Sequence, residues 1–255
     1  MKLLVYCLLV LAVTAVCPTV SKADDATNGP VRDSSSFHTI FVPAELEPWQ
    51  KRRKAFAETI RGVQERKTTA LLELDQVLTD YEKNPFQRTP IESMEILGVF
   101  YIPKDGVEPQ FHLVVMYALL GWYDVLRFGS PSAQSELFTN ERFFLKPFML
   151  GGPRVISEAL QLFKSKPERM KQQLASGIEY AEKWRDNTDY DHEWPASYGL
   201  ARMMAAMNGK PLKSTEKMPK EQWDKAWQDA IKTVTWFYSE HCLQYLEALN
   251  SRNHK

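Results

Sequence analysis

The segment of the sequence with the most side chains capable of chemistry is residues 186–193, Asp-Asn-Thr-Asp-Tyr-Asp-His-Glu. Its four carboxylates, one amide and one imidazole are groups that bind Ca²⁺ or a transition metal. The glycine and glutamate spacing of an EF-hand loop is missing, however, and no second histidine stands three or four residues from His192. We therefore predict no metal site here, and expect either an acidic edge that faces a protein partner or an ordinary solvated loop.

Two aromatic residues, Trp194 and Tyr198, follow this loop beside Gly199. We expect a helix over 195–209, with Trp194 packing at its entry and Gly199 admitting a neighbouring helix. A flat platform for a carbohydrate or another ligand is the alternative. Because Trp and Tyr dominate the energetics of protein interfaces, both residues join the loop carboxylates in the predicted partner-binding set. The set is Asp186, Asp189, Asp191, Glu193, Trp194 and Tyr198.

Candidates for catalysis are fewer. His112 and His241 lie on apolar helix faces, where a hydrogen-bonded core histidine is the common case, and a pairing of either with Asp124 or Glu240 stays open. The sequence has no Gly-x-Ser-x-Gly, His-Glu-x-x-His or phosphate-binding glycine motif. Cys242 neighbours His241, but adjacent helical residues do not face each other, so we expect a buried structural thiol. We predict no catalytic residue and no cofactor, and hence a protein that is not an enzyme.

The N-terminal residues have the pattern of a secretory signal peptide. Lys2 precedes an apolar run over 3–17, and Ser21 and Ala23 supply small residues at positions −3 and −1 of a cleavage site. The run is shorter than the roughly 20 residues that span a bilayer. We therefore expect cleavage after Ala23 and a product outside the cytoplasm, with no integral membrane segment left.

The residues after the predicted cleavage site are nearly balanced in charge. Removal of 1–23 takes away two of the 32 basic residues and none of the 32 acidic residues. No basic patch indicates a nucleic-acid partner. Cys242 is then the single cysteine, so stability must come from the core and not from a disulfide. This favours a bacterial periplasm over an animal extracellular space.

The remaining pattern predicts helices. Prolines suited to the first turn of a helix recur at positions 48, 109, 131, 153, 167, 195 and 219. Apolar stripes indicate a first helix over 48–83 and a last helix after Pro219, whereas 98–103 is expected to be extended. The segment 109–128 is apolar nearly all round, as in a central buried helix. We predict a flexible segment at 24–43 and an all-α domain at 44–250. It is a single-domain irregular helical bundle around the helix at about 109–128, with the first and last helices sharing its core.

Two stretches carry a resemblance to known proteins. They are Tyr-Asp-His-Glu-Trp-Pro-Ala-Ser-Tyr-Gly-Leu at 190–200, followed by Met-Met-Ala-Ala-Met-Asn-Gly at 203–209, and Gly-Trp-Tyr-Asp-Val-Leu-Arg-Phe-Gly at 121–129. They resemble helical secreted proteins encoded beside type VI secretion effectors in Gram-negative bacteria, which serve as periplasmic immunity proteins, often against lipase-type toxins. The resemblance implies a protein that binds a cognate secreted toxin and performs no chemistry. A small periplasmic hydrolase and an envelope scaffold are the alternatives, and the oligomeric state is left open.

Overall fold

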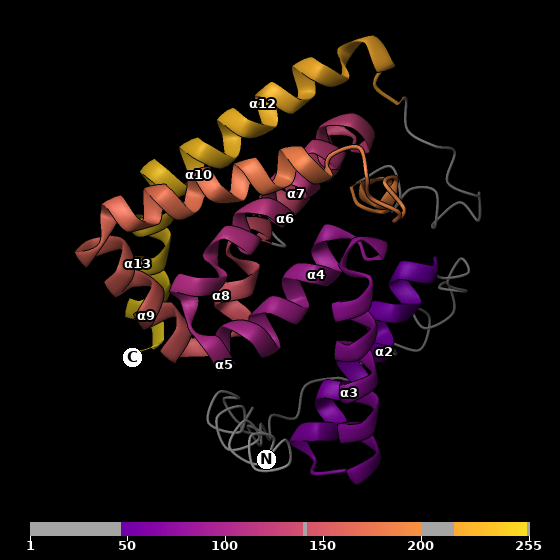
Figure 1. The fold of residues 1–255 in the computed structure, drawn as a ribbon, viewed down its shortest axis with the longest axis vertical. Coiled ribbons are helices and arrows are strands. Elements are labelled where there is room, and N and C mark those ends of the chain that lie inside the picture. Colours follow the sequence, from indigo (N-terminus) through magenta and orange to yellow (C-terminus); the bar gives the residue numbers. More distant parts are fainter. Residues whose placement is uncertain (1–46, 140–141, 200–216, 254–255) are drawn as a thin grey trace, which may run out of the picture.

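A computed structural model describes residues 47–139, 142–199 and 217–253 (Figure 1). These residues form helices joined by turns, with no strand among them, which confirms the predicted all-α class. The expected signal peptide, the cleavage after Ala23 and the segment 24–43 lie outside the described residues.

The longer helices are α2 (Pro48–Gln64), α3 (Thr68–Lys83), α4 (Pro90–Ile96), α6 (Val107–Phe128), α7 (Pro131–Thr139), α9 (Gly152–Ser165), α10 (Pro167–Trp184), α12 (Trp223–Trp236) and α13 (Cys242–Asn253). The shorter elements are α5 (Ile102–Asp105), α8 (Lys146–Leu150), the 3-10 turns η2 (Pro85–Gln87), η4 (Phe143–Leu145), η5 (Trp194–Ser197) and η6 (Lys220–Gln222), and the π-helical segments η3 (Leu97–Tyr101) and η7 (Phe237–His241).

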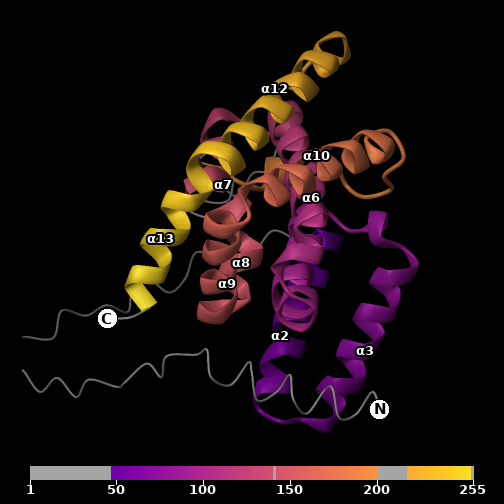
Figure 2. The same ribbon diagram turned by 60° about the vertical axis from the view of Figure 1, so that its left-hand side comes forward.

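Helix α6 is the centre of the molecule, as predicted. It packs most extensively against α10, α12 and α4 (Figures 1 and 2). By length and composition, α6 is the one helix of the described residues that could cross a membrane, but 83% of its most apolar stretch is buried inside the protein. The last helix shares the core of α6, and the buried side chains of α2 and α3 belong to the same core, although α2 packs mainly on α3.

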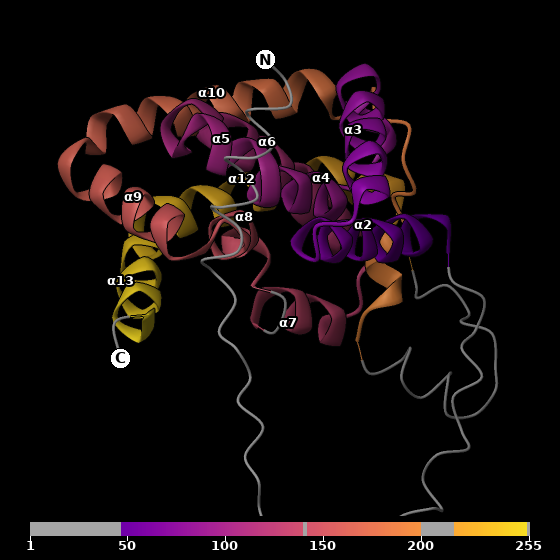
Figure 3. The ribbon, with the colours of Figure 1, turned by 90° about the horizontal axis from the view of Figure 1, so that it is seen from below.

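The predicted single helix over 48–83 is wrong, because the chain turns after Gln64. Arg66 adopts a left-handed conformation with φ of 60°, and α3 then packs along α2 at one end of the molecule (Figure 3). An apolar period of 3.6 residues continues through such a hairpin when both arms face the same core. The spacing alone therefore could not separate one long helix from two short ones.

The extended segment predicted at 98–103 is also wrong. The chain forms the π-helical η3 and then α5, and α8 packs against η3. Val99, Phe100 and Tyr101 favour extended structure locally, but tertiary packing overrides such propensities.

The last helix contains a register change that the apolar stripe did not reveal. It passes from α12 through the π-helical η7 into α13, and the extra residue of a π turn rotates everything after it. Cys242 and Leu246 are therefore buried, whereas Tyr245 is 46% exposed. The predicted burial of Cys242 is confirmed.

Replacement of Cys242 by serine should lower the free energy of unfolding by about 1–2 kcal/mol, because the hydroxyl enters an apolar site without a partner. Burial raises the pKa of the Cys242 thiol well above its usual value, so little thiolate forms at neutral pH. The native protein should thus react with a maleimide only as fast as it unfolds. Rapid stoichiometric labelling under native conditions, with denatured protein as the reference, would contradict this burial.

Candidate functional site

The acidic loop, residues 186–193, follows α10, and its carboxylates point into solvent. The exposed side chains are Asp186, Asp189, Asp191 and Glu193. Arg185 contacts Asp186 at 3.0 Å, and Lys217 forms an ion pair with Glu193. Asp189 has no ion-pair partner among the residues that the structure describes. These four carboxylates therefore lie on the surface of the loop, and two of them have a basic partner there.

Trp194 and Tyr198, in contrast, are not available to a partner. Trp194 is 0% exposed and Tyr198 is 9% exposed. The ring of Trp194 lies 5.9 Å from that of Phe143 and 6.3 Å from that of Trp49, centroid to centroid. Our expectation that these two aromatics anchor a partner needs correction, because they pack in the core beneath the acidic loop.

The helix expected from Pro195 does not start as predicted. After the 3-10 turn η5, Tyr198 is extended and Gly199 has a φ of 90°. A Cβ at Gly199 would lie 2.6 Å from the backbone nitrogen of Ala133, so this glycine does admit the neighbouring helix α7. Its N–H donates to Glu136 Oε2 at 2.6 Å. The rest of the expected helix, 200–209, lies outside the described residues.

A buried carboxylate, Asp124 of α6, connects the acidic loop to the core. Asp124 is 0% exposed, and its Oδ1 accepts from Arg127 Nη2 at 2.5 Å and contacts His192 Nδ1 at 3.1 Å. Its Oδ2 accepts from Trp194 Nε1 at 3.1 Å. Burial, followed by the charge of Asp124, raises the pKa of Tyr190 well above its usual value, so this hydroxyl stays protonated beside the carboxylate. Asp124 thus ties α6 to the loop.

The histidine that contacts Asp124 is His192, whereas the sequence suggested His112 or His241 as its partner. His192 lies 68 positions away along the chain, and only the packing of the loop on α6 brings it close. His112 instead lies against Tyr180, and His241 lies against Trp236 at 3.9 Å between ring centroids. In the part of the chain that the structure describes, neither of them forms an ion pair.

The same contacts create a chain of groups with the order of a hydrolase triad. His192 Nδ1 faces Asp124, and His192 Nε2 lies 3.2 Å from Thr188 Oγ1. The charge of Asp124 is, however, already balanced by Arg127. The described residues contain no group of three His, Cys, Asp or Glu side chains that could hold a metal ion.

A pocket of about 410 Å³, the aromatic pocket, adjoins the acidic loop. Phe86 and Trp184 form the shared boundary: their rings stack at 3.7 Å, and the carbonyl of Phe86 accepts from the N–H of Asp189 at 3.0 Å. Its lining residues come from α3, η2, η3, α5, α6 and α10, and are Tyr81, Glu82, Pro85, Phe86, Leu97, Tyr101, Asp105, Gln110, Leu113, Met116, Tyr117, Tyr180 and Trp184.

The chemistry of the aromatic pocket suits a cation. Six of its thirteen lining residues are aromatic, and its carboxylates are Glu82 and Asp105. The hydroxyls of Tyr81 and Tyr117 hydrogen-bond each other at 2.9 Å, and burial raises the pKa of Tyr117 to about 12, so this wall is uncharged. Aromatic faces and carboxylates together attract ammonium and guanidinium groups. Nothing in the sequence indicated this pocket, because its lining residues lie far apart along the chain.

A comparison of the chain with protein-family models gives no match, and comparisons with curated proteins and with solved structures give none either.

Proposed function

We propose that this protein is a periplasmic immunity protein, which neutralises a secreted antibacterial toxin by binding it directly. The observation that supports the proposal is the acidic loop, fixed in place beside an open aromatic pocket that also carries carboxylates. Together they offer carboxylates to a basic segment of the toxin, and Asp189 and Asp191 have no ion-pair partner among the described residues. Complementary charge accelerates association and selects the partner.

The acidic loop is ordered before any partner arrives. Its backbone N–H groups donate at Asn187 to the carbonyl of Trp184 and at Asp189 to that of Phe86, both at 3.0 Å. The Glu193 N–H donates to Asp191 Oδ1 at 2.9 Å. A loop held in this way loses little conformational entropy on binding, so more of the interaction energy appears as affinity.

The aromatic pocket extends this surface inward. A lysine or arginine side chain of the toxin would lie against the rings of Tyr180 and Trp184, with Glu82 or Asp105 as its counter-ion. Tyr180 is 42% exposed, which makes its ring accessible from solvent. Such a buried cation–aromatic contact is the kind of anchor that slows dissociation.

The direct test is co-expression with the effector encoded next to this gene, directed to the periplasm. We expect the cells to survive only when this protein is exported, and a purified complex to bury about 1,600 Å² or more. Equal killing with and without this protein would overturn the proposal for that effector. A stable homo-oligomer that shows no toxin binding would favour the envelope scaffold instead.

Charge reversal on the acidic loop should slow association with the toxin. The variant Asp189→Lys with Asp191→Asn keeps the acceptor for the Glu193 N–H but reverses the local charge, and we expect about a tenfold lower association rate at low salt. Tyr180→Ala should instead raise the dissociation rate. Surface plasmon resonance measures both, and the control is Glu168→Lys, an exposed reversal at the opposite end of α10. An unchanged association rate in the loop variant would place the interface elsewhere.

The second candidate function is ester or amide hydrolysis, favoured by the chain from Asp124 through His192 to Thr188. If it operates, the purified protein hydrolyses simple esters, and His192→Ala abolishes the activity while Thr188→Ser retains it. No activity above that of His192→Ala would remove this candidate without affecting the first.

A further inference from the structure

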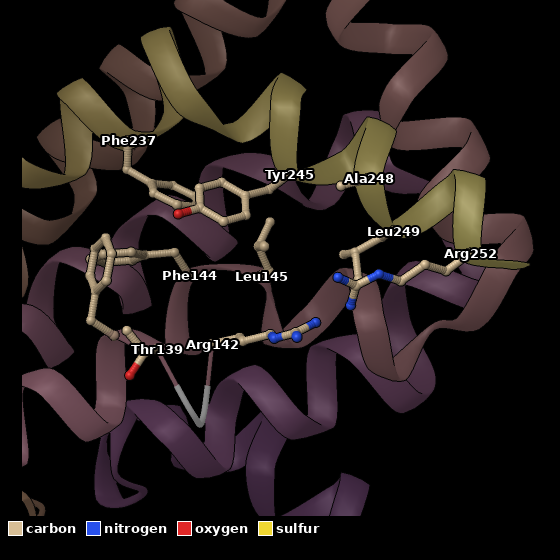
Figure 4. Close-up of a pocket in the computed structure, with 10 residues that line it drawn as sticks. Thr139, Arg142, Phe144, Leu145, Phe237, Tyr245, Ala248, Leu249 and Arg252 are labelled. Atoms are coloured by element: carbon tan, nitrogen blue, oxygen red, sulfur yellow. The ribbon is translucent and has the colours of Figure 1, made fainter.

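A second pocket, the arginine pocket, lies between α7, η4, η7 and α13 and has a volume of about 270 Å³ (Figure 4). Most of its lining is apolar, and its polar groups are one hydroxyl-bearing threonine, one tyrosine and two arginines. The lining residues are Phe138, Thr139, Arg142, Phe144, Leu145, Phe237, Tyr245, Ala248, Leu249 and Arg252.

The two arginines have no counter-ion among the described residues. Arg142 and Arg252 come from opposite sides of the pocket and extend toward each other along one edge of it (Figure 4). Some other guanidinium groups in the protein have carboxylate partners, such as Arg52 with Glu92 and Arg53 with Glu95. Two guanidiniums at one edge of an apolar cavity, without a counter-ion in the described part of the chain, are complementary to a carboxylate or phosphate.

The backbone departs from regular α-helical geometry on both sides of this pocket. Arg142 adopts a left-handed conformation, with φ of 47° and ψ of 51°, which is uncommon outside glycine and is found more often at functional sites. On the other side, the π-helical η7 begins at Phe237, and the rings of Phe237 and Tyr245 stack at 5.8 Å between centroids.

The π turn explains how these two rings meet. Residues eight apart on a regular α-helix point about 80° away from each other. One inserted residue leaves roughly 20° between them, and the rings of Phe237 and Tyr245 share one face. Such π turns occur frequently at functional sites, and this one shapes a wall of the arginine pocket.

We propose that the arginine pocket binds a single-chain amphiphilic anion, with its alkyl chain against the aromatic walls and its carboxylate or phosphate between Arg142 and Arg252. The volume is slightly below the roughly 300–1,000 Å³ of drug-sized sites, so a medium-length chain fits and a two-chain lipid does not. This site is separate from the acidic loop and from the aromatic pocket, which share no lining residue with it.

The test is isothermal titration of the purified protein with decanoate and decyl phosphate below their micelle concentrations. We expect saturable one-site binding of at least one of them, and at least tenfold weaker binding of decyltrimethylammonium, which has the same chain length and the opposite charge. Arg252→Gln and Arg142→Asn should each weaken binding about tenfold or more. Asparagine tolerates the left-handed conformation, so the second variant keeps the backbone of Arg142.

Two further variants separate the pocket from the rest of the surface. Ala248→Trp fills the pocket from an exposed position of α13 and should abolish binding without loss of thermal stability. Arg61→Gln removes an exposed charge from α2, outside the pocket, and should leave binding unchanged. None of the three pocket variants, Arg142→Asn, Arg252→Gln and Ala248→Trp, should alter protection against the toxin.

The proposal is overturned if Ala248→Trp binds decanoate as the parent protein does, or if the cationic amphiphile binds equally well. It is also overturned if the protein binds only vesicles of anionic lipid, because that result would indicate a membrane surface and not a single chain.

Discussion

Replacement of Asp124 by leucine should lower the free energy of unfolding by about 3–5 kcal/mol, because it leaves the buried guanidinium of Arg127 without its counter-ion. Arg127 is only 6% exposed, and its position over the ring of Tyr123, at 3.7 Å, cannot replace a full negative charge. The same substitution removes the acceptor of the Trp194 indole N–H and the contact of His192. Equilibrium unfolding in guanidinium chloride, followed by tryptophan fluorescence, measures the loss.

The matched control is Asp229→Leu on α12, where the carboxylate is half-exposed and lies 3.7 Å from Lys232. A surface pair of this kind contributes at most about 1 kcal/mol. The double variant Asp124→Leu with Arg127→Leu removes both charges and should be more stable than Asp124→Leu alone. If the double variant were the less stable of the two, the ion pair would not be the source of the loss.

Asp124→Leu should also loosen the acidic loop. With His192 and Trp194 released from α6, amide hydrogens over 187–194 should exchange faster than in the parent protein, while those in α9 change only with global stability. Toxin binding should weaken in parallel if the proposed function holds, since the loop would have to be ordered on binding.

Replacement of Gly121 by leucine should lower the free energy of unfolding by about 1–3 kcal/mol or more, because the larger side chain overpacks the core. A Cβ at this position would lie 2.3 Å from Phe143 Cζ and 2.9 Å from Pro90 Cβ, and Phe143 is fully buried. Even Gly121→Ala should destabilise, although alanine normally stabilises a helix relative to glycine by about 1 kcal/mol. Thermal unfolding by circular dichroism gives the comparison.

A second substitution tests the cause. Phe143→Leu removes the ring atoms nearest to Gly121. Gly121→Ala should therefore destabilise the Phe143→Leu protein less than it destabilises the parent protein. Equal costs in both backgrounds would mean that the ring of Phe143 is not what limits this position.

Much of the fold could be predicted because strong local signals agree with the tertiary structure. Pro48, Pro131 and Pro167 are each the first residue of a helix, where the missing N–H is not needed. The segment 109–128 is apolar on all sides, and burial by α4, α10 and α12 is the arrangement that removes such a surface from water. No comparable signal marked the turn after Gln64 or the π segments, because an apolar stripe does not depend on which partner helix covers it.

Some features of the candidate site could likewise be predicted from the sequence, and others could not. Exposure of Asp186, Asp189 and Asp191 could be predicted from the cost of burying a charge without a partner, which follows from residue type alone. Burial of Trp194 could not, because a tryptophan after a polar loop serves equally well as a core residue or as an interface anchor, and only its contact with Asp124 separates the two. The two pockets and the link from His192 to Asp124 join residues far apart along the chain. Composition and local spacing determine which segments form helices and which charges stay exposed. Contacts between residues far apart along the chain depend on how the helices pack together.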